Sequence, residues 1–175
     1  MTRLFLIFCL LFAALAGGCA GPGTPQSEPR LLRKANVLPL ALDPAFSFRK
    51  TKLFFHDLKQ EKQTTSDTVN FERERLSYGA VAATELQARE GNYFDFWWRA
   101  ERTANVTVRL EYRQQNLGAY VQAQEVDVPA ACGTEHTKFK VVGDNYRQDG
   151  RVIAWRALLI ENGKVVALTQ SFLWN

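Results

Sequence analysis

Cysteine and histidine are the side chains of this sequence best suited to bond-making chemistry. Cys132 and His136 lie four residues apart, and Glu135 directly precedes the histidine. A thiol within hydrogen-bond reach of an imidazole, itself oriented by a carboxylate, is the arrangement of a cysteine nucleophile. The stretch from Ala130 to Gly133 is typical of a loop, which does not hold such a pair together. A Cys/His hydrolase is therefore the least favoured hypothesis, and we expect that the chain is not an enzyme.

Metal and cofactor sites are not predicted either. A zinc site needs three or four ligands, whereas His56, His136 and Cys132 do not form a ligand-spaced cluster. Asp144, Asn145 and Asp149 lack the spacing of a calcium loop and are typical of turns, where such side chains satisfy local backbone groups. No phosphate loop, dinucleotide fingerprint or nucleophile elbow occurs. We therefore expect no metal and no cofactor.

Aromatic side chains form the most distinctive cluster. Neighbouring residues of a strand point to opposite faces, so the alternation places Phe94, Phe96 and Trp98 on one face. Tyr93, Trp97 and Arg99 share the other face with Asp95, and that mixture suits a half-exposed surface. Tyr93, Trp97 and Arg99 are the candidate binding surface, for stacking on sugar rings or for anchoring a protein partner. The alternative is a second packed layer beneath residues 36–60.

The strand elements that would position this surface are predicted from turns and alternation. Asn162-Gly163 indicates a two-residue type I′ turn. It predicts a hairpin over 151–174 that pairs Glu161 with Lys164, and places Arg151 over the Trp174 ring. Further along the same register, Ile160 faces Val165, Leu159 faces Val166, Trp155 faces Gln170, Ile153 faces Phe172 and Val152 faces Leu173.

Other segments complete a mainly β chain. Residues 106–113 alternate apolar and polar, which predicts one buried and one wet face. We expect strands at 69–82 and 119–128, a break at 129–133, irregular structure at 36–60, and a short helix at 83–90, for which a strand is the alternative. The fold class is an antiparallel β-sandwich, immunoglobulin-like or fibronectin-like in the loose sense; a sheet backed by one helix is the alternative.

The N-terminus has the pattern of a secretory signal. Arg3 precedes an apolar run from Leu4 to Ala16, and small residues follow. The segment Leu15-Ala16-Gly17-Gly18-Cys19 resembles the lipobox of bacterial lipoproteins. That resemblance implies that Cys19 becomes the first mature residue, carries acyl chains such as palmitate, and holds the protein at the membrane. Ala20 after the cysteine implies an outer-membrane address in the cell envelope. Cleavage after Ala16, which would release a soluble secreted protein, is the alternative.

The domain organisation follows from these patterns. Residues 1–18 are a signal peptide, residues 19–35 a lipidated N-terminus and disordered tether, and residues 36–175 a single β-rich domain. Removing the signal peptide takes one cation from the formal net charge of +4 and leaves +3. That charge is too diffuse to predict nucleic-acid binding. Cys132 is then the one remaining thiol of the domain, so no disulfide within it is expected.

These observations together predict a non-enzymatic, lipid-anchored domain of the cell envelope. Its partners are expected to be the membrane, through the N-terminal lipid, and another protein of the envelope. Recognition of a carbohydrate such as peptidoglycan through exposed aromatic rings is the alternative.

Overall fold

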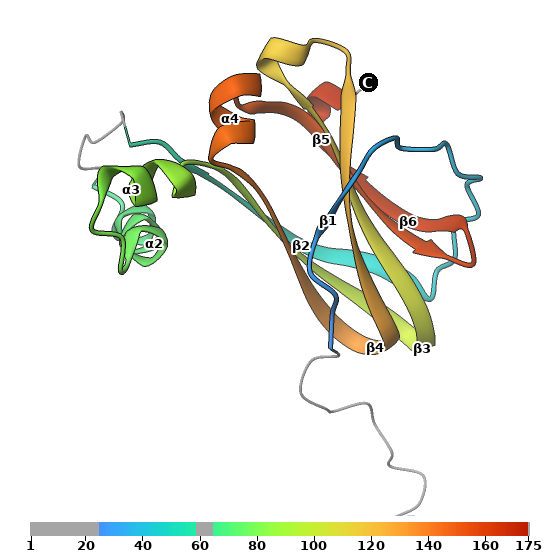
Figure 1. Cartoon of the computed structure of the whole chain (residues 1–175). Helices are drawn as coiled ribbons and strands as arrows, with labels where there is room; N and C mark the ends of the chain where they lie inside the picture. The colour runs from blue at the N-terminus through green and yellow to red at the C-terminus, as the bar shows by residue number, and fades with distance from the viewer. Residues whose placement is uncertain (1–24, 59–64, 175) are drawn as a thin grey trace, which may run out of the picture.

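The structure, a computed structural model, describes residues 25–58 and 65–174 (Figure 1). The predicted signal peptide and Cys19 lie outside these residues. The described elements, in chain order, are β1 (Arg30–Leu32), β2 (Phe46–His56), α2 (Asp67–Ser77), α3 (Ala83–Arg89), β3 (Gly91–Gln114), η1 (Gln115–Leu117), β4 (Val121–Val142), α4 (Asp144–Asp149), β5 (Val152–Glu161), β6 (Lys164–Gln170) and η2 (Phe172–Trp174). The mainly β, antiparallel class is confirmed.

The strands of the described residues form one six-stranded sheet that bends on itself. The order is β1-β4-β3-β5-β6, and β2 also pairs with β3. β2 pairs with residues 91–100 of β3, whereas β5 pairs with residues 107–114. Between these halves the β3–β4 register shifts around Ala100 and Ala104, and Ala130 has a positive φ of 52°. β3 and β4 therefore bend together, which gives the sheet a first limb with β2 and a second limb with β1, β5 and β6 (Figure 1).

The hydrophobic core lies between the two limbs. Phe94, Phe96 and Trp98 of the first limb are buried, so the predicted alternation of this strand is confirmed. The Phe96 ring lies 5.5 Å from that of Trp155 on β5, which places the limbs face to face. Trp98 Nε1 donates to Thr137 Oγ1 (3.0 Å), so its buried polar atom is satisfied. A sheet folded in this way buries its apolar face as two sheets of a sandwich do.

The C-terminal hairpin forms at the predicted turn. Asn162 and Gly163 have φ of 49° and 73°, as a type I′ turn requires, and Glu161 pairs with Lys164. A register shift after Ile160 then pairs Leu159 with Ala167, so the predicted pairing beyond that point is wrong by one residue. The chain leaves β6 at Gln170, so Phe172 and Leu173 do not pair with Ile153 and Val152.

The predicted contact of Arg151 with Trp174 is also wrong. The guanidinium groups of Arg113 and Arg156 lie 4.8 Å and 5.0 Å from the Trp174 ring centroid. Both arginines come from strands of the second limb, and Trp174 follows in η2. Trp174 therefore does make cation–π contacts, but with Arg113 and Arg156 and not with Arg151, because the turn after β6 places its ring beside those two side chains.

Three other segments differ from their predictions. Residues 69–82 are not a strand, since α2 spans Asp67–Ser77, rich in the helix-favouring residues Glu and Arg. The irregular structure expected at 36–60 holds for its first part, but β2 runs over Phe46–His56. No break separates strands at 129–133, because β4 continues through a bend. The short helix expected at 83–90 is confirmed as α3.

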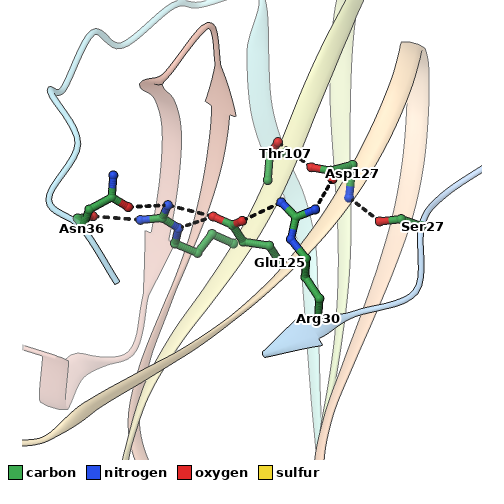
Figure 2. Close-up of polar contacts among 7 residues, drawn as sticks. Ser27, Arg30, Asn36, Thr107, Glu125 and Asp127 are labelled. Atoms are coloured by element: carbon green, nitrogen blue, oxygen red, sulfur yellow. Dashed lines mark hydrogen bonds and ion pairs between the residues drawn. The ribbon is translucent and has the colours of Figure 1, made fainter. Parts of the chain in front are cut away.

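The N-terminal segment belongs to the folded structure earlier than expected. β1 pairs with β4, with Arg30 opposite Glu125 and Leu32 opposite Ala123, and Ser27 N donates to Asp127 O (2.9 Å). The predicted tether up to residue 35 is therefore wrong for residues 27–35. Residues 27–36, the N-terminal strap, lie across the face of the second limb that was expected to be wet (Figure 2).

Candidate functional site

The predicted surface residues Tyr93, Trp97 and Arg99 lie on the outer face of the first limb. β2 flanks β3 on one side and β4 flanks it on the other, with Lys50 opposite Trp97 and Trp97 opposite His136. The His136 ring stacks on Trp97 with 4.2 Å between centroids, and Lys50 Nζ lies 5.1 Å from the Trp97 centroid. Trp97 is therefore engaged by its own neighbours, which leaves little ring face for stacking on a sugar.

Tyr93 and Arg99 lie at different places on this outer face. Tyr93 is half-buried near α3, where its hydroxyl donates to Arg89 O (2.5 Å). Burial raises the pKa of the Tyr93 hydroxyl, so the group stays protonated and acts as a donor. Arg99 is exposed, and its Nε lies 4.0 Å from Glu101 Oε1. The three residues share a face but do not converge on one point.

Cys132 and His136 do not form a catalytic pair. Both lie on β4, where four residues of extended chain span roughly 13 Å. Cys132 is partly buried on β4, and the other cysteines of the sequence, Cys9 and Cys19, lie outside the described residues. His136 Nε2 is 3.8 Å from Asp95 Oδ1, but burial lowers the pKa of the imidazole despite that carboxylate. Glu135 is buried on the core side of the strand, away from the ring.

The turn residues Asp144, Asn145 and Asp149 are part of α4. Arg147 Nη2 donates to Asp144 Oδ1 (2.5 Å), and Gln122 Nε2 donates to Asp149 Oδ2 (3.3 Å). Within residues 25–58 and 65–174, no group of three or more metal-ligating side chains comes together. No helix in the same ranges is both long and apolar enough to cross a bilayer.

A ladder of charged side chains, in which Arg109 and Glu125 are buried, crosses the second limb beneath the strap. Arg109 Nε donates to Glu125 Oε1 (2.7 Å), and its Nη1 donates to Asn36 O (2.9 Å). Arg30 bridges Glu125 and Asp127 from the strap, at 3.0 Å and 2.7 Å (Figure 2). These contacts pair the charged groups with one another and fasten the strap to the second limb.

An apolar groove opens between β2 and the C-terminus. It encloses about 410 Å³, and its exposed rim consists of Leu53, Ile153, Phe172 and Leu173. Phe172 and Leu173 are 90% and 65% exposed, so the C-terminal turn presents large apolar side chains to solvent. The sequence did not predict this exposure, because the hairpin was expected to continue to residue 174. Phe172 and Leu173 lie beyond Gln170, where β6 ends.

A second hollow, the α2 cavity, lies where α2 crosses the outer face of the first limb. It encloses about 320 Å³ between β2, β3, β4, α2 and the start of the strap. Lys138 and Lys140 line it from β4 and were not singled out from the sequence. The signal that would have found them is the spacing of His136, Lys138 and Lys140, which places three basic groups on one strand face.

Comparisons with known proteins add no relative to this picture: no family model, curated protein or solved structure matches the chain. The functional proposal therefore depends on the exposed surfaces of the protein and their chemistry.

Proposed function

We propose that this protein is exported, lipidated on Cys19, and serves as a non-enzymatic binding domain of the cell envelope that contacts a protein partner through the apolar groove. The observation that carries the protein-partner hypothesis is the groove rim, Leu53, Ile153, Phe172 and Leu173. Contiguous exposed apolar side chains around a hollow mark interaction sites on soluble domains, because their exposure to water is unfavourable.

Carbohydrate recognition is the less favoured candidate. A sugar-binding aromatic offers a free ring face, whereas Lys50 and His136 lie against Trp97. The exposed rim of the groove is apolar, and the polar side chains among the lining residues are those of Asn92, Tyr93 and Ser171. Both properties suit a protein surface that contributes its own apolar side chains.

Site-specific photo-crosslinking tests the protein-contact hypothesis in intact cells. A photoreactive amino acid replaces Ile153 or Phe172 at the groove, and Leu31 on β1 serves as the matched control with 59% exposure. We expect the same discrete cross-linked protein from both groove positions and none from residue 31. The double variant Phe172→Ser/Leu173→Ser should abolish the product from residue 153. Equal products from groove and control, or none from the groove, would contradict the proposal.

Mass spectrometry of the mature N-terminus, before and after reduction, tests the anchor. Lipidation predicts an N-terminal Cys19 carrying a thioether-linked diacylglycerol. A disulfide through Cys19 would use the same sulfur atom, so the two modifications exclude each other. An unmodified terminus at Gly17 would contradict membrane anchoring and leave the protein-contact hypothesis to its own test.

A further inference from the structure

The α2 cavity combines an apolar wall with charged groups at its mouth. The wall is formed by Phe54 of β2, Leu76 of α2, the Tyr93 ring and Pro29 of the strap. Its volume of about 320 Å³ falls in the range of pockets that bind small molecules. The cavity lies on the outer face of the first limb and shares only Phe54 and Tyr93 with the apolar groove.

The charges around the cavity do not balance. Lys52, Arg75, Lys138 and Lys140 face two carboxylates, those of Glu72 and Asp95. Glu72 is already shared, since it pairs with Lys52 and with Arg75 Nη2, the latter at 2.8 Å. Asp95 is therefore the carboxylate that remains to balance Lys138 and Lys140.

Lys138 and Lys140 are the groups left for a ligand. They lie two residues apart on β4 and so point to the same face, opposite Asp95 and Tyr93 respectively. Asp95 Oδ1 approaches His136 Nε2 at 3.8 Å. Within the described part of the chain neither lysine forms an ion pair. Two adjacent ammonium groups beside an apolar wall complement a molecule with an anionic end and an apolar body.

We propose that the α2 cavity binds a small amphipathic anion, an acyl chain that ends in a carboxylate or a phosphate. Lys138 and Lys140 hold the anionic end, because charge-assisted hydrogen bonds from ammonium groups to such oxygens are strong. The chain lies against Phe54, Leu76 and the Tyr93 ring, where burial of its methylene groups contributes to affinity. This site shares Phe54 and Tyr93 with the apolar groove but includes none of the four residues of the groove rim.

Isothermal titration calorimetry of the full chain with soluble probes below their micellar concentrations tests the site. Decanoate represents a free fatty acid and decyl phosphate represents a phospholipid end, with octyl glucoside as the uncharged comparison. We expect saturable binding of at least one anion, with the uncharged amphiphile at least tenfold weaker. The tighter of the two anions identifies the source of the ligand.

Two variants separate the charged from the apolar contribution. Lys138→Gln/Lys140→Gln should weaken binding at least tenfold, and Leu76→Trp should block the cavity while leaving both lysines in place. Lys164→Gln, which removes an exposed lysine at the β5–β6 turn, is the matched control and should bind as the unaltered protein does. Circular dichroism establishes that each variant is folded.

Two results would overturn the assignment. One is the absence of saturable heat from both anions with the unaltered protein. The other is equal affinity of the unaltered protein and the double lysine variant. Neither result depends on Phe172 or Leu173, so the two proposals fail separately.

Discussion

Arg109 and Arg102 carry the same charge on the same strand but lie in different surroundings. The Arg109 side chain is 5% exposed and is held by Glu125 and Asn36, whereas the Arg102 side chain is 47% exposed between Asp43 and Glu161. An exposed pair is screened by water and contributes at most about 1 kcal/mol. Removing one partner of a buried pair leaves an uncompensated charge in the interior, which costs roughly 3–5 kcal/mol.

The variant Arg109→Ala is therefore expected to lower the free energy of unfolding by about 3–5 kcal/mol, because Glu125 would stay buried with a weaker set of partners. Arg102→Ala is the matched control and should lower it by much less, because its ion pairs are exposed and screened by water. Urea unfolding followed by circular dichroism measures both. Similar losses for the two variants would show that the ladder of charged side chains does not fasten the strap.

His56 is expected to make stability depend on pH. Its ring is buried with Nε2 3.4 Å from Ser77 Oγ, and burial, followed by the charge of Arg73, lowers its pKa against the opposing effect of Asp57. The unfolded chain takes up a proton near the ordinary pKa of 6.5, whereas the folded protein resists it until lower pH. His56 thus contributes stability above pH 6.5, which is lost as the pH falls below that value.

Thermal unfolding midpoints between pH 7.5 and pH 5 measure this effect. We expect His56→Gln to flatten the decline toward pH 5, since glutamine takes up no proton in either state. His136→Gln provides the comparison, because the pKa of His136 is also lowered by burial, although that ring is less buried. An unchanged pH profile in His56→Gln would assign the acid sensitivity to other groups.

At the scale of elements, the entry into β3 depends on Gly91. Its φ of 145° is one that residues with a side chain rarely adopt, and a Cβ there would lie 2.2 Å from Val141 O on β4. The close approach lets the first residue of β3 pair with Val142, the last residue of β4. Gly118, in the turn between the same strands, has a φ of 58° and no neighbouring atom within 4 Å of an added Cβ.

We expect Gly91→Ala to lower the free energy of unfolding by on the order of 3 kcal/mol or more, through backbone strain and the clash with β4. Gly118→Ala has backbone strain without a clash and should cost less, about 1–3 kcal/mol. Chemical denaturation compares the two variants. If both lose the same amount, the close packing of β3 on β4 at Gly91 does not set the cost.

At the scale of the whole molecule, the strap decides where the folded unit begins. Residues 27–36 add β1 to the sheet edge and cover Arg109 and Glu125 of the second limb. Without them these charged groups would meet water, and residues 123–125 of β4 would keep β3 as a neighbour but lose β1.

A chain that begins at Asn36 should therefore be less stable than one that begins at residue 25, with a lower urea midpoint. The loss should exceed that of Arg30→Ala in the longer chain, because the truncation removes both the ion pairs and the β1 ladder. Equal midpoints for the two lengths would support the sequence-predicted boundary at residue 36 instead.

Local patterns in the sequence were sufficient for several features of the fold. The alternation around Phe96 identified the core face of β3, Asn162-Gly163 located the hairpin turn, and the β class followed from alternation and turns. Each depends on near neighbours in the chain: side-chain direction alternates along any strand, and positive φ at two successive positions favours Asn and Gly. The shared face of Tyr93, Trp97 and Arg99 followed for the same reason.

Contacts between distant segments decided the rest. Arg109 and Glu111 have the pattern of a wet face, yet both are buried in the folded protein. β6 ends at Gln170, and the turn that follows leaves Phe172 and Leu173 exposed. α2 converts an outer strand face into a cavity beside Lys138 and Lys140. Periodicity reports which side chains share a face but not what packs upon it. That choice depends on the summed burial and charge pairing of the whole chain, so only the tertiary structure reveals it.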